Sequence, residues 1–330
     1  MNCVDNFWFA RRRGRDTRPG GRHPGLTPCF MGSIFVARTC RAILGTLCLM
    51  LVGLEAGNIP AAVAAGELEQ GQRLAEGLRS GEAVWLEDGQ SKYFCVFNPD
   101  QSGQPKGGVI ILHDANSHPD KPQVIRPLRD WLPRHGWATL AVQLPALDRP
   151  ADYLTQQAII TKRINGAVTY MQNNGFNNLV LLGHGTGALA AGHYLSAQSS
   201  EFVHAFVAIS MGVLEVRNED DSILEQLQRI NLPMLDIYGG NDLPYVTKSV
   251  RQRALAARAS GNAATRANRV EAYRRSAIAK SSNQKREGYI AFRQIRIDGA
   301  PHDFSGAEGL LSKRIIGWLE RHAKGVAVNR

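Results

Sequence analysis

The stretch VLLGHGTGALA, residues Val180–Ala190, decides the fold class of this chain. An apolar run ends at Leu182, three alternating glycines follow within Gly183–Gly187, and an alanine-rich segment comes next. A buried strand that enters a helix through a tight glycine turn is the repeating unit of an α/β sheet. Because glycine has no side chain, Gly185 at the centre of the turn offers only its backbone.

Further strands and helices alternate on both sides of this unit. Two short apolar runs, Val84–Leu86 and Lys92–Phe97, are joined through Asp88-Gly89 and predict an opening hairpin. The last strand is expected at Tyr289–Ile297. The pattern predicts an α/β chain with a doubly wound, mostly parallel sheet and an N-terminal antiparallel hairpin. The five strands of parallel type are expected at Gly108–Leu112, Trp137–Val142, Leu179–Leu182, Ala205–Ile209 and Met234–Tyr238.

The first 64 residues differ in composition from the rest. Two arginines precede the apolar run Ala42–Leu54, and the small-residue stretch Ala61–Ala65 follows it. A charged, then apolar, then A-x-A order is that of a secretory signal peptide, so we expect cleavage after Ala64. Translation from Met31 would give a signal of ordinary length. Residues 65–330 are then expected to form one domain, and the expected location is the periplasm.

The cysteine content and the net charge limit which partners we expect for this chain. Four of the five cysteines precede Ala64, so the mature chain keeps only Cys95 and cannot form an internal disulfide. The formal charge is +10, but the first 64 residues hold 8 Lys and Arg against 3 Asp and Glu, which leaves 31 against 26. Much of the remaining excess lies in a basic helical segment, 247–285. We interpret that segment as a solvent-facing extension, with peripheral contact to an anionic membrane or glycan as the alternative, and expect no nucleic acid.

Polar residues follow the strands at one edge of the predicted sheet. Because the carboxyl ends of parallel strands gather binding groups, we expect these residues to lie near one another. The acid lies in YGGND after a strand, and the last histidine lies in GAPHDF before the final helix. The candidate residues are His113, Asp114, His184, Thr186, Asp242 and His302.

These segments resemble the α/β-hydrolase superfamily over roughly Lys92–Lys324, and more narrowly the uncharacterised bacterial family DUF3530. The superfamily order along the chain is nucleophile, acid, histidine. The resemblance implies that Gly185 stands at a vacant nucleophile position, Asp242 at the acid and His302 at the histidine. A histidine in this role needs a carboxylate that fixes its tautomer, so we expect Asp242 and His302 to pair.

The resemblance also implies an oxyanion hole. The loop His113–Pro119, which contains Asp114, would supply one backbone N–H, and Thr186 would supply the other. Backbone amides do not depend on the missing serine, so both donors would survive. We expect His184 to pack rather than to catalyse.

Two functions stay open for a hydrolase fold without its serine. The first is a ligand-binding or scaffold pseudoenzyme of the cell envelope, which recognises a small molecule or an envelope component. The second is an active hydrolase of ester- or amide-like substrates. In that case the Asp242–His302 dyad would activate water, or a hydroxyl of Thr186, Ser117 or Ser210 would replace the serine.

The glycine turn has one competing interpretation. Gly183-x-Gly185-x-x-Ala188 matches a loose dinucleotide-binding turn, but that fingerprint needs an Asp or Glu at the end of the next strand. The next strand ends at Ile209-Ser210. His113, Asp114 and His118 lie close together in sequence without a companion cluster that would complete a metal site. We therefore expect neither cofactor nor metal.

Overall fold

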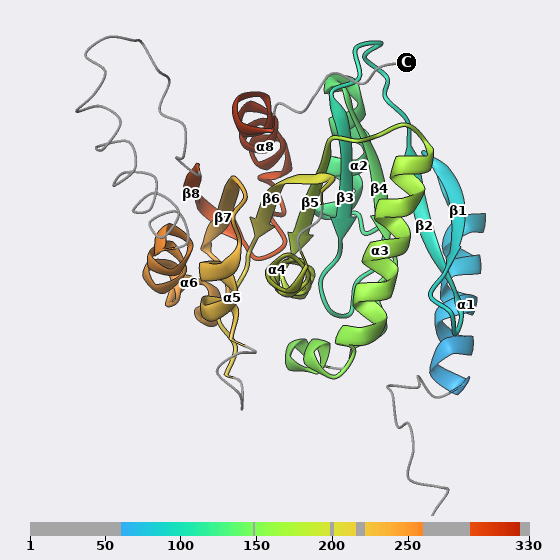
Figure 1. Cartoon of the computed structure of the whole chain (residues 1–330), viewed down its shortest axis with the longest axis horizontal. Helices are drawn as coiled ribbons and strands as arrows, with labels where there is room; N and C mark the ends of the chain where they lie inside the picture. The colour runs from blue at the N-terminus through green and yellow to red at the C-terminus, as the bar shows by residue number, and fades with distance from the viewer. Residues whose placement is uncertain (1–60, 148, 199–200, 216–221, 260–290, 324–330) are drawn as a thin grey trace, which may run out of the picture. The chain divides into compact units, whose positions relative to one another are not determined.

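The computed structural model describes residues 61–323 apart from 148, 199–200, 216–221 and 260–290 (Figure 1). All of them belong to the unit Glu55–Arg330. The predicted signal peptide therefore lies almost entirely outside the described residues, as does most of the basic segment 247–285. Among the described residues, no helix combines the length and the apolar character that a membrane span requires.

Eight strands form one sheet in the order β1-β2-β4-β3-β5-β6-β7-β8 (Figure 1). β1 pairs with β2, and β2 with β4, in antiparallel fashion, whereas every other neighbouring pair is parallel. The strands are β1 (Glu82–Glu87), β2 (Lys92–Asn98), β3 (Gly107–Leu112), β4 (Trp137–Val142), β5 (Leu179–His184), β6 (Val203–Ile209), β7 (Met234–Asn241) and β8 (Phe292–Pro301).

This topology confirms the predicted mostly parallel sheet with an N-terminal hairpin. The expectation of five parallel strands was wrong by one, because β8 also pairs in parallel with β7. β8 extends to Pro301 rather than ending at Ile297. The longer strand carries the chain directly to His302, at the carboxyl edge of the sheet.

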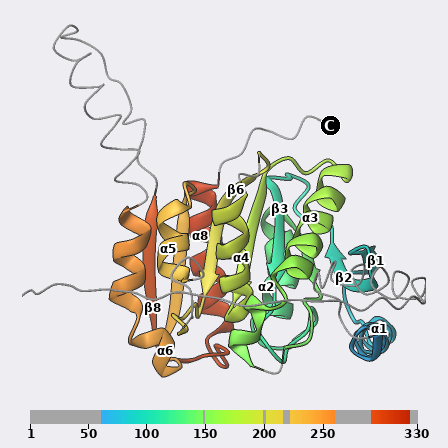
Figure 2. The ribbon, with the colours of Figure 1, turned by 60° about the horizontal axis from the view of Figure 1, so that its bottom comes forward.

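Helices cover both faces of the sheet (Figure 2). Helices α3, α4 and α5 pack into one apolar core, and α2 and α8 pack into the other, to which α1 adds a partly buried flank. The helices are α1 (Ala61–Glu76), α2 (Ile125–Trp131), α3 (Gln157–Asn173), α4 (Thr186–Ala197), α5 (Ile223–Arg229), α6 (Pro244–Thr247) and α8 (Glu308–His322). Residues 250–259 are also helical, and short 3₁₀ turns span Leu132–His135 and Pro150–Leu154.

The central strands are buried on both faces, which explains why their sequences are continuous apolar runs. Every residue of β3, β4 and β5 is buried. Parallel strands covered by helices on two sides need no alternation of polar and apolar residues. Each fully buried Leu or Ile side chain contributes roughly 1.5–3 kcal/mol, so these strands form the rigid base of the site at their carboxyl ends.

Helix α1, which the sequence did not predict, is attached to the sheet by a buried ion-pair cluster. Arg163 of α3 is fully buried and donates to Glu67 Oε2 at 2.6 Å and to Asp88 Oδ2 at 2.9 Å. Glu67 also accepts the backbone N–H of Ala146 at 2.8 Å. Glu67 is the third residue after the predicted cleavage point, so cleavage after Ala64 would leave this attachment intact.

Candidate functional site

The turn between β5 and α4 has the geometry of a sharp elbow. Gly185 adopts φ 54° and ψ −117°, and its N–H donates to the carbonyl of Ile209 at 2.9 Å. A Cβ at Gly183 would lie 2.4 Å from the nitrogen of Ala188, and a Cβ at Gly187 would lie 2.4 Å from the carbonyl oxygen of Leu112. These two glycines therefore let the helix approach the strands closely. A Cβ at Gly185 would collide with a different group.

The space beside Gly185 is filled by the carboxylate of Asp114. A Cβ at Gly185 would lie 2.2 Å from both Cγ and Oδ1 of Asp114, far inside van der Waals contact. Asp114 follows β3, which pairs directly with β5 through Leu112 and Gly183. The neighbouring strand thus delivers a carboxylate into the volume where a serine side chain would project from the elbow.

One oxygen of Asp114 occupies the predicted oxyanion hole. Asp114 Oδ1 accepts the backbone N–H of Ala115 at 2.8 Å and that of Thr186 at 2.7 Å. The hydroxyl of Thr186 donates to the same oxygen at 2.8 Å. The two amides are the donors expected from the loop after β3 and from the residue after the elbow. The two amides therefore point to one position, and a charge of the protein itself occupies it.

The second oxygen of Asp114 contacts the histidine. His302 Nε2 donates to Asp114 Oδ2 at 3.0 Å, and His302 Nδ1 donates to Asp242 Oδ1 at 2.6 Å. Burial alone would lower the pKa of His302, but hydrogen bonds and charge from Asp114 and Asp242 outweigh it and raise the pKa to about 9. At neutral pH His302 is therefore an imidazolium held between two carboxylates.

Asp242 is fixed on its buried side. Its side chain is fully buried and accepts the hydroxyl of Ser210 at 2.5 Å and the backbone N–H groups of Gly239 and Leu243 at 3.1 and 2.8 Å. Burial raises the pKa of Asp242, but the hydrogen bonds from His302 and Ser210 bring it below its usual range. Burial raises the pKa of Asp114 too, but the hydrogen bonds from His302 and Thr186, together with electrostatic interactions with His184 and His302, bring it well below its usual range. Both acids are ionised.

The two other predicted histidines support the loops. His184 Nε2 donates to the carbonyl of His302 at 2.9 Å, and the two imidazole rings lie 5.0 Å apart. His113 donates from Nδ1 to the carbonyl of Asp114 at 2.8 Å and accepts the N–H of Leu144 at Nε2, at 2.9 Å. Burial lowers the pKa of His184 and lowers that of His113 to about 4, so both rings are neutral. They position the backbone on either side of the ion triad Asp114–His302–Asp242.

A family model described as a protein of unknown function, DUF3530, matches residues 55–157 and 148–267. The chain belongs to the DUF3530 family. The comparison with curated proteins found no match.

Solved structures show that this DUF3530 protein has the fold of known α/β hydrolases. Est1E from Butyrivibrio proteoclasticus shares 13% identity at a TM-score of 0.53, covering 73% of this chain and 98% of Est1E. A dienelactone hydrolase from Anabaena variabilis shares 20% at 0.53, covering 74% and 98%. The Pyrococcus furiosus esterase Pf2001 shares 15% at 0.53, covering 74% and 93%. At such low identities the likeness shows the fold, as the sequence motifs predicted.

The DUF3530 site contains one group of side chains with metal-ligating atoms. One atom each of Asp114, His184 and His302 lies within 4.8 Å of the others. These groups already bond to one another or to backbone: the His302 Nε2 proton goes to Asp114, and His184 Nε2 bonds to a carbonyl. A metal ion would have to displace those bonds. That no metal is used stays a prediction.

The proposed substitutes for the serine have other partners in this DUF3530 chain. The hydroxyl of Thr186 donates to Asp114, and that of Ser210 donates to Asp242. Within the described part of the chain, no hydrogen bond joins Ser117 to His302, whose Nε2 faces Asp114. Sequence reasoning named Asp114 as a pocket residue but missed that its side chain fills the hole. The available signal was an acid in the loop after β3, beside an elbow without a side chain.

Proposed function

We propose that this protein is a ligand-binding or scaffold pseudoenzyme of the cell envelope, built on a hydrolase fold that performs no serine chemistry. The observation that carries the proposal is the carboxylate of Asp114 in the oxyanion hole, bonded to the catalytic-type histidine. Its ligand would be a small molecule or an envelope component, and no nucleic acid is involved.

Acyl transfer needs a nucleophile, an open oxyanion hole and a neutral base. Gly185 offers no nucleophile, Asp114 fills the hole, and the raised pKa of His302 keeps its ring protonated at neutral pH. The last point also weighs against water activation by the Asp242–His302 dyad, because an imidazolium cannot accept a proton.

The hole holds Asp114 more strongly than it would hold a substrate carbonyl. Hydrogen bonds to charged groups contribute about 1.5–3 kcal/mol each, against about 0.5–1.5 kcal/mol for neutral partners. Asp114 accepts three such bonds at Oδ1 and a fourth from His302 at Oδ2. A neutral ester that displaced this carboxylate would exchange stronger bonds for weaker ones and would leave His302 with one partner fewer.

A second candidate function is hydrolysis with Asp114 as the nucleophile. The favouring observation is that Oδ1 lies in the hole while the side chain keeps 18% of its surface exposed. Oδ2 would attack an electrophilic carbon and expel the leaving group with its electron pair. Water would then attack Cγ while neutral His302 takes its proton; the bond between Cγ and the alkylated oxygen breaks, and the product leaves as an alcohol that receives this proton from His302. Because the pKa of His302 is about 9, such activity would rise toward alkaline pH.

Export is part of the proposal and rests on residues 38–64, most of which lie outside the described residues. The A-x-A stretch at Ala62–Ala64 supports a cleavage that frees a domain whose first fixed contact is Glu67. N-terminal sequencing of protein from a periplasmic extract should begin at Ala65. Recovery in the cytoplasm with an uncleaved leader would contradict this part of the proposal.

The central test exposes the purified mature protein to a fluorophosphonate probe and to short- and long-chain nitrophenyl esters. We expect no adduct and no turnover above that of the His302→Ala variant. Labelling or turnover that disappears in His302→Ala would refute the pseudoenzyme. An alkyl adduct on Asp114, formed from an epoxide or alkyl halide and hydrolysed faster as pH approaches 9, would establish the second candidate instead.

A further inference from the structure

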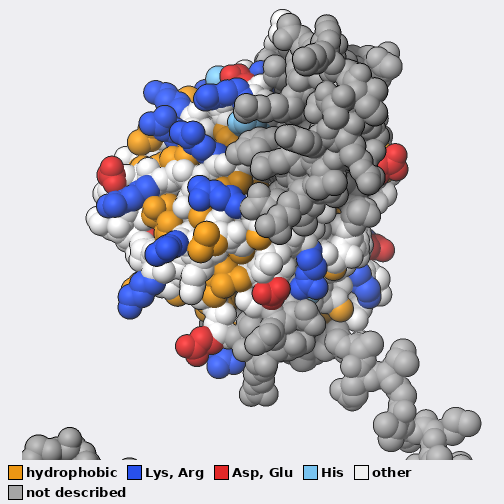
Figure 3. Space-filling view, turned by 60° about the vertical axis from the view of Figure 1, so that its left-hand side comes forward, with side chains coloured by type: hydrophobic (Ala, Val, Ile, Leu, Met, Phe, Trp, Pro, Cys, Tyr) orange, Lys and Arg blue, Asp and Glu red, His pale blue; other side chains and the backbone are white. Residues whose placement is uncertain are grey.

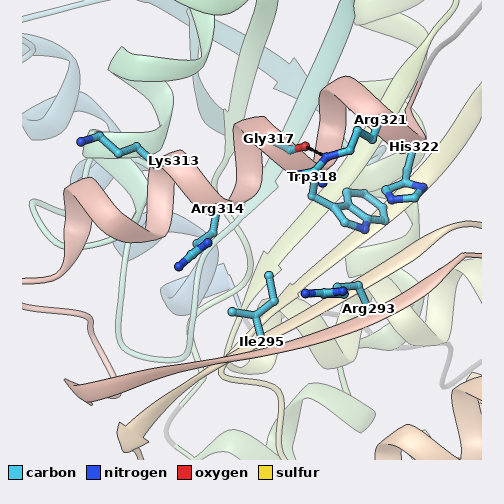
Figure 4. A pocket seen from close by; sticks show the side chains of 8 residues that line it. All are labelled: Arg293, Ile295, Lys313, Arg314, Gly317, Trp318, Arg321 and His322. Atoms are coloured by element: carbon cyan, nitrogen blue, oxygen red, sulfur yellow. Dashed lines mark hydrogen bonds between the residues drawn. The ribbon is translucent and has the colours of Figure 1, made fainter.

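A cleft whose lining includes no residue of the ion triad lies between the edge strand β8 and helix α8 (Figure 4). Arg293 and Ile295 line it from β8, two residues apart and therefore on the same face of the strand. Arg314, Trp318 and Arg321 line it from α8, at spacings that place them on one side of the helix. The cleft encloses about 140 Å³, room for a group of several atoms rather than a single water.

The lining is cationic and has no acid of its own. Arg293, Lys313, Arg314 and Arg321 contribute positive charges, and the described residues that line the cleft include no Asp or Glu. In the described part of the structure, no ion pair neutralises any of these four side chains; the Nε of Arg321 donates to the carbonyl of Gly317 at 2.7 Å within its own helix. By contrast, Arg296 on the same strand pairs with Asp298 at 2.9 Å.

The surrounding surface has the same character. Figure 3 shows Lys and Arg side chains spread among apolar patches on the face that includes β8, with few acidic side chains between them. Cations gathered without counter-charges repel one another and attract anions.

A buried donor without a partner points to a ligand in this cleft. The indole Nε1 of Trp318 is buried, the residue is only 3% exposed, and no described residue forms a hydrogen bond with this nitrogen. Figure 4 shows its ring extending from α8 toward β8, beside Arg293. Most buried donors in proteins are paired, so an unpaired donor beside several cations favours an anionic acceptor from outside the chain.

The lowered pKa of His322 agrees with the positive charges around this cleft. Its ring lies 5.2 Å from that of Trp318. Burial lowers the pKa of His322, and the charges of Arg321 and Arg293 lower it further. The imidazole ring of His322 is therefore neutral at pH 7 and lines the cleft beside the arginines.

We propose that the β8–α8 cleft binds a phosphate-bearing anion, with Arg293, Arg314 and Arg321 holding the phosphate oxygens and the Trp318 indole N–H donating one further hydrogen bond. Arginine forks match phosphate oxygens in pairs, and several forks on one group favour phosphate over a single carboxylate. Ile295 and the Trp318 ring offer an apolar surface to whatever carries the phosphate. The source is either a soluble phosphate ester or a lipid headgroup of the envelope.

The test uses the purified mature protein with two probes. Inorganic pyrophosphate is titrated up to about 10 mM, which detects dissociation constants into the millimolar range. Vesicles of phosphatidylcholine with and without phosphatidylglycerol are tested by co-sedimentation. Arg293→Gln/Arg314→Gln removes two forks, and Trp318→Phe removes the N–H but keeps the ring. Arg296→Gln is the matched control, since Arg296 is exposed on the same strand and does not line the cleft.

We expect the double variant to weaken binding of the effective probe by about tenfold or more for each arginine removed. Trp318→Phe should weaken it severalfold, and Arg296→Gln should leave it within about twofold. The Trp318 indole proton, assigned by its loss in Trp318→Phe, should shift on binding. Pyrophosphate binding identifies a soluble ligand, and binding to phosphatidylglycerol vesicles alone identifies a headgroup. Failure of both probes with folded protein, or equal losses in Arg296→Gln and the double variant, would overturn the proposal.

Discussion

Restoring a serine at position 185 should produce an esterase only when Asp114 is removed at the same time. In Gly185→Ser alone, the new Cβ would lie 2.2 Å from Cγ and Oδ1 of Asp114, so the carboxylate must leave the hole. It would lose four hydrogen bonds, and each bond to a charged group contributes about 1.5–3 kcal/mol. The positive φ of Gly185 adds about 1–3 kcal/mol of strain for any residue with a side chain.

The Asp114→Ala/Gly185→Ser double variant avoids the collision and keeps only the strain. We therefore expect it to be more stable than Gly185→Ser alone, although the stability losses of two independent substitutions usually add. Removing Asp114 also frees the N–H groups of Ala115 and Thr186 for an oxyanion. His302 would keep Asp242 as its single carboxylate, so its pKa should fall from about 9 into the range of a working base.

The assays are fluorophosphonate labelling with mass-spectrometric mapping, and hydrolysis of a short nitrophenyl ester. The double variant should be labelled at position 185 and should exceed Asp114→Ala by at least about 10²-fold, the lower end of what a positioned base contributes. Adding His302→Ala should abolish the gain. A double variant that unfolds cooperatively yet remains inert would refute the assignment of these residues to a dormant triad.

Three further predictions follow from buried groups. Because the pKa of His302 is raised from 6.5 to about 9, the ion triad stabilises the fold fully below about pH 6.5 and loses this contribution as pH rises through 9. In urea denaturation, the free energy of unfolding of the wild type should fall by roughly 3 kcal/mol relative to that of His302→Gln between about pH 6 and pH 9.5. A difference that stays constant over this range would contradict the role of His302. Arg163→Met should lower the free energy of unfolding by about 3–5 kcal/mol, because Glu67 and Asp88 would stay buried without their cation. The control Arg149→Met removes an exposed ion pair with Asp152 and should cost less than about 1 kcal/mol. Similar losses in both variants would disprove the role of the buried cluster. Burial raises the pKa of the Cys95 thiol to about 12, so a thiol reagent should label its peptide only after unfolding, and rapid labelling of native protein would contradict the packing of β2.

The sheet and the elbow could be predicted from sequence because both are encoded locally. Parallel strands covered on two faces must be apolar throughout, and residues 180–190 combine such a strand with closely spaced glycines. The placement of Asp242 and His302 at one edge followed from the strand ends that carry them. These positions depend on the order of the strands along the chain, which the sequence shows, although β8 runs four residues further than predicted, to Pro301.

The state of the site could not be predicted, because it depends on contacts between distant segments. Nothing local distinguishes an Asp114 that faces solvent from one whose carboxylate accepts the N–H of Thr186, 72 residues later. Helix α1 was missed because its anchoring residue is a buried Glu67, whose partner Arg163 lies 96 residues away. The cationic cleft was missed for the same reason: Arg293 and Arg321 come from separate elements that meet only in the fold.

The candidate site is closed by its own carboxylate around a protonated histidine. Nitrogen-15 NMR of the His302 ring during a pH titration tests this arrangement most directly. His302 should carry protons on both ring nitrogens at neutral pH, with a pKa of about 9 in the wild type and a clearly lower pKa in Asp114→Asn. A neutral His302 at pH 7, with the same pKa in wild type and in Asp114→Asn, would contradict it.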